Sequence, residues 1–589
     1  MPKSREYRWT FSTIDSADPT SHQNALEKVK RLSDELNISP ILAEILVRRG
    51  IETFETARAF FRPSLDDLHD PFLFEGMYRA VDRIDRALKE KEKILIYGDY
   101  DVDGTNSTAL LWTFFKRLGA EAYYFIPDRI KQGYGLSAFG IDYGKEIGAT
   151  LLIAVDCGIT AIEPVAYATS LGIDVIICDH HEPGDKIPDA YAVLDTFMPG
   201  CRYPFKYLCG CAVAFKLIQG ITKTLFDIEN DEVKQSLYSY LDFVTLATTA
   251  DIVNLTGENR LLVKLGLELL NTNPRPGIRA LIESSGLKLG KISAGQIVFV
   301  LAPRINAVGR LGDALRAVQL LTCPSYEEAL KLAQVFEEEN RNRRKIDEGT
   351  FLEAQELVEN YLNFEKESAI ILHQETWHPG VIGIVASRLV EKYYRPAIMM
   401  TTIDGVAKGS ARSVAGFDIY QALKKCEDKL LQFGGHKYAA GLSIEIDRLD
   451  EFKEAFNAIA RELLTEELLT PEIRIDAEIS LRELTPKFVR ILCQFAPFGP
   501  NNMRPVFVAR NVEVVGTPRI VGGKHLRLKV KNNGQIFDAI GFNLAGMLDL
   551  VTSGEGSLSI AFSLDESEYF GEVIPQLKLR DIKREAAGA

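Results

Sequence analysis

The stretch "KILIYGDYDVDGTNSTALLWTFFKRLG" (residues 93–119) predicts a buried β-strand followed directly by an α-helix. Its first part is a near-continuous apolar run, and its second part has the length and apolar spacing of a helix. The same alternation continues downstream, with strands expected at 122–128, 150–158, 174–182 and 190–195. Apolar strands that alternate with helices are typical of parallel strands covered on both faces. We therefore expect an α/β fold with a parallel sheet.

A chain of 589 residues is too long for one hydrophobic core. After the parallel-sheet region, a segment rich in charged residues has a helical period. This predicts a long exposed helix between two lobes. A second α/β pattern follows this helix, and short strands with turn residues then predict an OB-like β-barrel. The expected segments are an N-terminal helical segment at 1–75, the parallel-sheet domain at 76–324, the connecting helix at 325–366, the second α/β domain at 367–466 and an OB-like nucleic-acid-binding domain at 467–589.

The composition excludes some classes of protein and leaves the substrate open. A net charge of -13 argues against a protein that coats nucleic acid nonspecifically, although it is compatible with a local basic channel. The eight scattered cysteines include no CxxC pair, which indicates neither a disulfide framework nor a structural zinc site. No stretch approaches the roughly 18 continuous apolar residues of a membrane span. We expect a cytoplasmic protein without membrane contact.

Acidic and imidazole side chains follow several of the expected strands. The first segment ends in Asp99, Asp101 and Asp103, the segment at 150–158 ends in Asp156, and the segment at 174–182 ends in Asp179, His180 and His181. A single acid after a strand is more often a turn former or a helix cap. In an open parallel sheet, however, ligands bind outside the carboxyl ends of the strands. Several like charges at one edge repel one another unless a cation neutralises them.

Carboxylates and imidazoles at this density favour Mn²⁺ or Mg²⁺, with two ions expected, over a thiolate zinc site. Two divalent ions about 3.5–4 Å apart activate a water molecule and hold the attacking and leaving oxygens of a phosphoryl group. The expected reaction is metal-assisted phosphoester hydrolysis. Asp251, in the segment "LATTADIVNL", is the only acid near an apolar helix. It is either a further ligand or a cap for the segment that follows.

Two downstream segments carry side chains suited to phosphate. In "GGHKYAAGLS", Gly434 and Gly435 allow a close approach of the backbone to a phosphate, and His436 can donate to it. In "KGSARS", Ser410 and Arg412 lie on one face of the expected strand. An arginine beside a hydroxyl binds phosphate well, although an ordinary strand ending is the alternative.

Further basic and polar side chains lie near the end of the first lobe. "LAPRINAVGR" contains Arg304, Asn306 and Arg310, which are candidates for nucleic-acid contact. The basic run "RNRRK" (341–345) lies on the expected connecting helix, where a solvated helix face is the alternative.

At these motifs the sequence resembles the DHH phosphoesterase family, whose name describes the "DHH" at 179–181. The segments "DYDVDGT", "VDCG", "CDHHEP" and "ATTADIV" match its four metal-binding motifs in order. "GGHKYAAGLS" resembles the glycine-rich signature of the DHH-associated domain. The resemblance implies that the metal ligands are Asp101, Asp103, Asp156, His180 and Asp251.

The resemblance also implies roles for the histidine pair. His181 is expected to contact the reacting phosphate or its water, and catalytic roles are expected for Asp103 and His180 as well. Asp179 is expected to orient a histidine. Some members of the family have a histidine four residues before the first Asp of the DxD pair, where this sequence has Tyr97. This leaves the ligand set of one metal ion open.

The arrangement of two lobes, a long helix and a barrel resembles the members of this family that degrade single-stranded DNA. It implies 5′→3′ hydrolysis that releases 5′-phosphorylated nucleotides in recombination and repair, with Ser410 and Arg412 holding the 5′ end. An OB-like barrel favours single strands because it stacks unpaired bases. The expected partner is single-stranded DNA, the candidate protein partners are a helicase and a single-strand-binding protein, and the expected state is a monomer.

Two other functions fit parts of the pattern. One is a DHH phosphodiesterase for short oligonucleotides or cyclic dinucleotides, which needs neither a barrel nor a long helix. The other is a noncatalytic single-strand-binding protein with a structural ion, although His181 and the aligned carboxylates exceed what such an ion requires. Metal-dependent hydrolysis of a dinucleotide compared with that of a long strand tests the first alternative. Binding without turnover in Mn²⁺ identifies the second.

Overall fold

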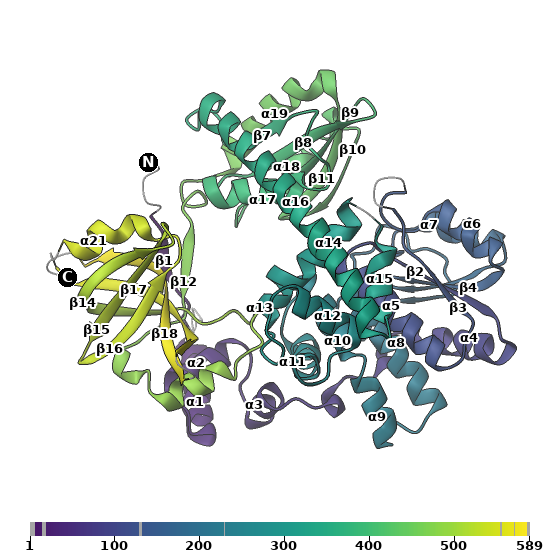
Figure 1. Ribbon diagram of the computed structural model, residues 1–589, viewed down its shortest axis with the longest axis horizontal. Coiled ribbons are helices and arrows are strands. Elements are labelled where there is room, and N and C mark those ends of the chain that lie inside the picture. Colours follow the sequence, from purple (N-terminus) through teal and green to yellow (C-terminus); the bar gives the residue numbers. More distant parts are fainter. Residues whose placement is uncertain are drawn as a thin grey trace. The chain divides into compact units, whose positions relative to one another are not determined.

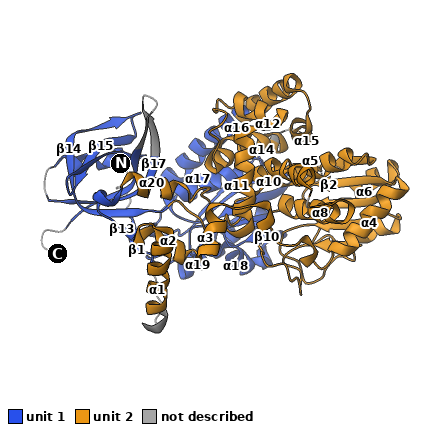
Figure 2. Ribbon diagram, turned by 90° about the horizontal axis from the view of Figure 1, so that it is seen from below, with its two compact units in different colours: residues 1–13, 341–484, 505–589 blue, residues 14–340, 485–504 orange. Residues whose placement is uncertain are grey.

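The computed structural model describes residues 6–13, 19–128, 132–228, 230–311, 313–553, 556–569 and 572–585. The chain divides into two compact units, which Figure 2 distinguishes by colour. Unit 1 comprises residues 1–13, 341–484 and 505–589, and unit 2 comprises residues 14–340 and 485–504. Each unit has its own sheets and its own hydrophobic core. In the described part of the chain, no helix is both long and apolar enough to cross a lipid bilayer.

Unit 2 contains a parallel sheet with the strand order β3-β2-β4-β5-β6. Figure 1 labels its strands β2, β3 and β4. Its strands are β2 (Lys93–Gly98), β3 (Ala122–Phe125), β4 (Ala149–Val155), β5 (Asp174–Cys178) and β6 (Ala192–Leu194). Gly98 pairs with Val155, Val155 with Cys178, and Cys178 with Leu194. The central strands therefore end level with one another, and the residues that follow them share one edge of the sheet.

Helices cover both faces of this sheet, which confirms the predicted parallel α/β lobe. Alternate residues of a strand point to opposite faces. Ile94 and Ile96 belong to a core cluster with α4 (Met77–Glu90), α5 (Val102–Arg117) and α8 (Gly210–Leu225). Leu95 belongs to a second cluster, which includes residues of α6 (Ala138–Glu146) and α7 (Ile162–Ser170). Burial on both faces explains the near-continuous apolar runs.

The remainder of unit 2 is mostly helical. The N-terminal helices are α1 (Pro19–Leu36), α2 (Pro40–Arg48) and α3 (Phe54–Phe61). After the sheet come α9 (Asp231–Tyr238), α10 (Leu241–Ala250), α11 (Gly257–Thr272), α12 (Pro276–Ser284), α13 (Ala294–Gln296), a π-helix (Ile297–Leu301), α14 (Ala302–Leu311) and α15 (Leu315–Thr322). Helix α20 (Pro486–Cys493) also belongs to this unit, although it lies between barrel strands in the sequence.

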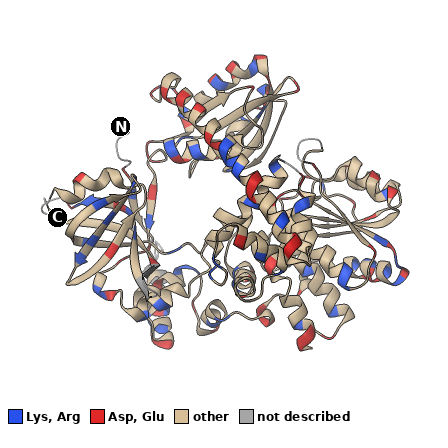
Figure 3. Ribbon diagram, in the orientation of Figure 1, with Lys and Arg blue, Asp and Glu red and all other residues tan. Residues whose placement is uncertain are grey.

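The predicted long helix is α16 (Tyr326–Tyr361), which runs from unit 2 into unit 1. Acidic and basic residues occur along its length, as the colours of the ribbon show (Figure 3). The sheet that follows has the order β10-β11-β9-β8-β7. Its strands are β7 (Ile370–His373), β8 (Ala397–Ile403), β9 (Val406–Arg412), β10 (Gln432–His436) and β11 (Ala439–Glu445), and its helices are α17 (Ile382–Tyr393), α18 (Ile419–Lys424) and α19 (Leu449–Leu463).

The last part of unit 1 is a β-barrel, as the turn-rich sequence predicted. Its sheet has the order β13-β14-β15-β16-β18-β17, and a further pairing of β14 with β17 closes it. The elements are β13 (Ala477–Glu478), β14 (Phe507–Val521), β15 (His525–Asn532), β16 (Gln535–Gly541), α21 (Leu548–Thr552), β17 (Leu558–Tyr569) and β18 (Glu572–Arg584). The N-terminal strand β1 (Arg8–Phe11) pairs in parallel with β12 (Glu472–Ile475), and this pairing was not predicted.

Candidate metal centre

Three buried acids occupy equivalent positions at the edge of the parallel sheet in unit 2. Asp99 directly follows β2, Asp156 follows β4 and Asp179 follows β5, and all three side chains are buried. The backbone continues the strand pairing at this point, because Asp156 N donates to Cys178 O (2.9 Å). The level strand ends thus bring the predicted acids to one edge.

The DxD pair lies at the start of α5. Asp101 is the N-cap, and its Oδ1 accepts a hydrogen bond from Gly104 N (3.0 Å). Asp103 is buried in the first turn, where its carboxylate accepts from the backbone N–H groups of Gly210 (2.6 Å) and Cys211 (2.8 Å) at the start of α8. A Cβ at Gly210 would lie 2.7 Å from Asp156 Cβ, so only glycine fits there. The sequence contained no signal for this role of Gly210.

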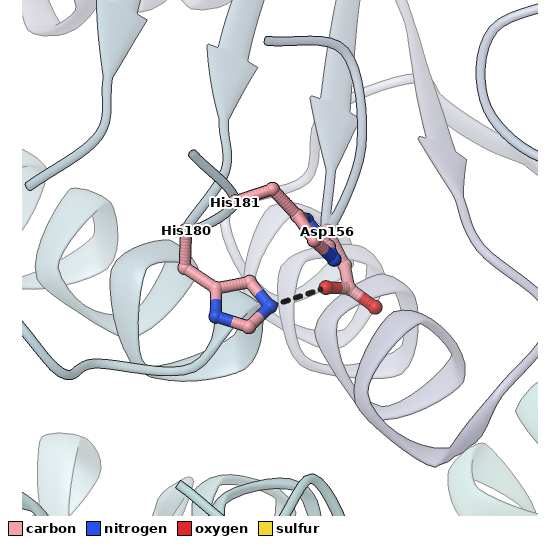
Figure 4. Close-up of side chains that lie close together, drawn as sticks. All are labelled: Asp156, His180 and His181. Atoms are coloured by element: carbon pink, nitrogen blue, oxygen red, sulfur yellow. Dashed lines mark ion pairs between the residues drawn. The ribbon is translucent and has the colours of Figure 1, made fainter. Parts of the chain in front are cut away.

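His180 joins acids from three different segments. Its Nε2 lies 3.1 Å from Asp156 Oδ1 (Figure 4), 3.7 Å from Asp103 Oδ2 and 3.8 Å from Asp251 Oδ2. Three sets of side chains bring ligand atoms within 4.8 Å of one another, and these are Asp156 with His180 and His181, Asp103 with His180 and Asp251, and Asp99 with Asp101 and Asp156. The structure therefore brings all five predicted ligands together.

The electrostatics of the cluster disfavour several ionised carboxylates unless a cation lies beside them. Burial and the neighbouring Asp101 raise the pKa of Asp103 to about 7. Burial and the charge of Asp103 raise the pKa values of Asp156 and Asp251 well above the ordinary range. Asp251 Oδ2 is also buried with no hydrogen-bond donor among the described residues. Oxygen-rich sets of this kind fit Mn²⁺ or Mg²⁺, which would neutralise the crowded carboxylates.

Asp179 holds His181 rather than joining the three sets. Its Oδ1 lies 2.7 Å from His181 Nδ1 and accepts from His180 N (2.8 Å), while its Oδ2 accepts from Ile159 N (2.9 Å). Although burial opposes both shifts, this contact lowers the pKa of Asp179 and raises that of His181 to about 9. This geometry is what an orienting carboxylate requires.

Two further side chains near the cluster were not predicted from the sequence. The hydroxyl of Tyr134 lies 3.4 Å from both ring nitrogens of His181. Asp195 follows β6 at the same edge of the sheet, and burial raises its pKa to about 7. The strand ending "AYAVLD" was a usable signal for Asp195, whereas nothing local distinguishes Tyr134.

The other polar candidates of unit 2 separate into two groups. Asn306 and Arg310 line a cavity of about 260 Å³ together with Asp99, Asp101 and Tyr134. Arg304 is not among the residues that line this cavity. Its guanidinium is buried, and it donates to Glu337 (2.6 Å) and to Val300 O (2.6 Å).

Tyr97 belongs to the second core cluster, and its hydroxyl donates to Gly135 O (2.9 Å). At the position where the resemblance puts a histidine in some members of the family, this chain thus has a hydroxyl that bonds a backbone carbonyl. The set formed by Asp99, Asp101 and Asp156 instead provides a third carboxylate at this point.

The phosphate candidates of unit 1 lie in register on neighbouring strands. Gly434 pairs with Gly441, which pairs with Ser410, while His436 pairs with Ala439, which pairs with Arg412. Arg412 Nη1 donates to Ser410 Oγ (2.9 Å). In α17, a Cβ at Gly383 would lie 2.8 Å from Ser410 Oγ and 3.0 Å from Arg412 Nη2. Gly435 has φ +142, and a Cβ there would collide with Ala439 O.

Comparison with known proteins identifies the family. Residues 93–248 match the DHH family N-terminal domain, residues 366–462 the DHHA1 domain and residues 475–581 the RecJ OB domain. The single-stranded-DNA-specific exonuclease RecJ of Bacillus subtilis is 38% identical over 94% of this chain and 69% of its own length. RecJ of Escherichia coli is 34% identical over 92% of this chain and 96% of its own length.

The chain belongs to the RecJ family. The crystal structure of RecJ from Thermus thermophilus in complex with Mn²⁺ matches it with a TM-score of 0.80 and 27% identity, over 99% of this chain and 80% of that one. The Mg²⁺ complex of the same RecJ matches with a TM-score of 0.75 and 26% identity, over 99% and 79%. The resemblance to DHH phosphoesterases is confirmed, and both expected metals occur in RecJ structures.

Proposed function

We propose that this chain is a single-stranded-DNA-specific 5′→3′ exonuclease that hydrolyses phosphodiester bonds with divalent metal ions and releases 5′-phosphorylated nucleotides. The observation that carries this proposal is the cluster of Asp103, Asp156, His180 and Asp251, whose crowded carboxylates call for cations. Membership of the RecJ family gives the substrate class. The long helix and the barrel speak against a hydrolase that acts only on small substrates.

The side chains of the cluster have distinct proposed roles. Asp101, Asp103, Asp156, His180 and Asp251 hold the ions, and Asp99 adds a carboxylate to one set. Bound Mn²⁺ or Mg²⁺ supplies Lewis acidity that makes a water nucleophilic and neutralises phosphoryl oxygens.

The rest of the proposed site acts on the phosphate and the strand. Asp179 fixes the ring of His181 and keeps it protonated, so that the imidazolium can donate to a phosphoryl oxygen. Arg310 and Asn306, in the same cavity as Asp99, bind the DNA backbone.

Digestion of strands labelled at either end tests the proposed activity. With Mn²⁺ or Mg²⁺, single strands labelled at the 5′ end should release labelled mononucleotide at once, while strands labelled at the 3′ end should release it only late. Duplexes should resist, and a chelator should stop the reaction. Early release from the 3′ end would contradict the polarity, and hydrolysis confined to dinucleotides would favour the small-substrate alternative.

Replacing Arg412 by Lys is expected to weaken the binding of 5′-phosphorylated strands. Lysine keeps the charge but loses the planar fork that binds phosphate with two hydrogen bonds. The KM for a 5′-phosphorylated strand should rise about tenfold, whereas the KM for the same strand with a 5′-hydroxyl should not change. Equal changes for both strands would show that Arg412 does not bind the terminal phosphate. Lys408→Arg on the same strand β9 is the control for a change of basic side chain.

We also propose the cellular setting that this activity implies. The proposed protein acts on DNA in the cytoplasm, as a monomer that works with a helicase and a single-strand-binding protein. Both proteins would supply or present the unpaired strand that such an exonuclease requires.

A further inference from the structure

The turn that follows Asp251 has an unfavourable backbone conformation. Asp251 caps the end of α10, and the next residue, Ile252, has φ +59. A β-branched residue rarely adopts this left-handed region, because its side chain clashes with its own backbone. Ile252 is also 61% exposed, so packing of its side chain offsets little of this cost. Contacts elsewhere in the turn must therefore stabilise it.

Such contacts come from α11, where Asn259 Nδ2 donates to Asn254 O (3.0 Å), and from the loop at 494–502, which lies between α20 and β14 in the sequence and belongs to unit 2. Leu255 N donates to Pro500 O (2.8 Å), and Asn501 Nδ2 donates to Asn254 Oδ1 (2.7 Å). The two segments also touch closely, because a Cβ at Gly499 would lie 2.9 Å from Leu255 Cδ2. The loop at 494–502 thus holds the turn at 252–255 through both backbone and side chain.

The loop at 494–502 is itself firmly anchored. Arg260, a buried residue of α11, donates from Nη2 to the carbonyl oxygens of Gln494 (3.2 Å), Phe495 (3.2 Å) and Ala496 (3.0 Å). Its guanidinium lies 3.7 Å from the centre of the Phe60 ring. The buried Asn502 adds hydrogen bonds from Nδ2 to the carbonyl oxygens at 495 (3.0 Å) and 497 (2.7 Å). Asn501, which donates to Asn254, therefore belongs to a loop that these hydrogen bonds hold in place.

We propose that Asn501 is a positioning residue for Asp251. Its hydrogen bond to Asn254 holds the turn at 252–255 in the strained conformation. The turn in this conformation keeps the carboxylate of the preceding residue, Asp251, beside Asp103 and His180. This inference rests on the proposed role of Asp251 as a metal ligand. Asn501 itself has φ +57, a region that glycine adopts freely, so Asn501→Gly removes the hydrogen bond without straining the loop.

Direct Mn²⁺ binding tests the proposal separately from turnover. We expect Asn501→Gly to bind Mn²⁺ roughly tenfold more weakly by electron paramagnetic resonance, the lower end of the losses seen when a ligand loses its support. The Mn²⁺ concentration for half-maximal activity should rise by the same factor, while kcat at saturating Mn²⁺ stays within about twofold. Asn543→Gly is the matched control, because Asn543 has the same φ of +57 in a barrel turn. It should bind Mn²⁺ like the parent.

A second substitution tests the strain itself. Asparagine adopts φ above zero far more readily than isoleucine. Adding Ile252→Asn to Asn501→Gly should therefore restore Mn²⁺ binding to within about twofold of the parent, because the turn no longer needs the hydrogen bond. If Asn501→Gly does not fold, Asn254→Ala removes the same hydrogen bond from the other side and should give the same result.

The outcomes separate this inference from the proposed function. Unchanged Mn²⁺ binding in Asn501→Gly would overturn the positioning role, and so would a loss that Ile252→Asn does not reverse. Asp251→Asn is measured in parallel. If Asp251→Asn leaves Mn²⁺ binding unchanged, the proposed metal site is wrong. If Asp251→Asn loses binding but Asn501→Gly does not, only the positioning role is wrong.

Discussion

Replacing Asp156 by Asn is expected to abolish cleavage and, at the same time, to stabilise the metal-free protein. Asp156 supplies a ligand atom to two of the three sets of candidate metal ligands. Its loss should therefore lower kcat by on the order of 10³-fold or more. Asparagine preserves the shape of the side chain and tolerates the φ of +59 at this position. The loss of activity should therefore come from the missing charge rather than from a rearranged loop.

The stability change follows from the raised pKa of Asp156. A group whose pKa is higher in the folded than in the unfolded state stabilises the fold below its unfolded pKa, and this contribution is lost as pH rises through the folded pKa. At pH 7 to 8 in a chelator, Asp156→Asn should thus have a higher Tm than the parent, with a difference that shrinks towards pH 4. Saturating Mn²⁺ should reverse the order, because only the parent gains stability from binding the ion.

Thermal unfolding with chelator and with Mn²⁺ measures both effects in one series. Asp185→Asn is the control, because Asp185 is an exposed acid six residues after Asp179. It should change neither Tm nor turnover. A fully active Asp156→Asn would remove Asp156 from the metal centre, and a fall of Tm in both conditions would mean that its carboxylate has a structural role instead.

The sequence predicts the grouping of these acids well because the fold itself brings them together. Apolar strands of a parallel sheet end level with one another, so acids written directly after such strands must share an edge. Asp99, Asp156 and Asp179 needed no information beyond their positions after β2, β4 and β5. Asp251 is different, because it comes from a helix end. Its role came from the resemblance to the DHH family rather than from the sheet.

Features that depend on distant segments could not be predicted. The pairing of β1 with β12 joins residues 8–11 to residues 472–475, and a four-residue strand carries no local sign of its partner. The N–H groups of Gly210 and Cys211 that hold Asp103 depend on how α8 begins beside α5. Arg304 looked equivalent to Arg310 in the sequence, yet it pairs with Glu337. The position of each arginine around helix α14, not its residue type, decides which of them lines the cavity.

Replacing Asp179 by Asn is expected to lower the rate about a hundredfold by changing the protonation of His181. The contact with Asp179 is the largest effect that raises the pKa of His181, and burial opposes it. Without the carboxylate, burial should lower this pKa from about 9, although the charges of Asp251 and Asp103 still raise it. A smaller fraction of His181 would then be protonated at neutral pH and able to serve as a cation beside the phosphate.

The parent ion pair stabilises the fold within a defined pH window. The contribution of His181 is fully present below pH 6.5 and is lost as pH rises through about 9, while that of Asp179 is present above its unfolded pKa of 3.8. Asp179→Asn should lower Tm between these limits. NMR titration of the His181 ring in the metal-free protein should give a pKa of about 9 in the parent and a clearly lower pKa in the variant.

The matched control for this substitution is Asp195→Asn, which removes another buried acid at the same edge of the sheet but keeps the contact between Asp179 and His181. It should leave the titration of His181 near 9. If Asp179→Asn keeps that titration near 9 as well, some other group holds the proton of His181. If the titration moves but the rate does not, the charge of His181 has no part in the reaction, because a group that stabilises the phosphate as a cation must act more weakly once it is neutral.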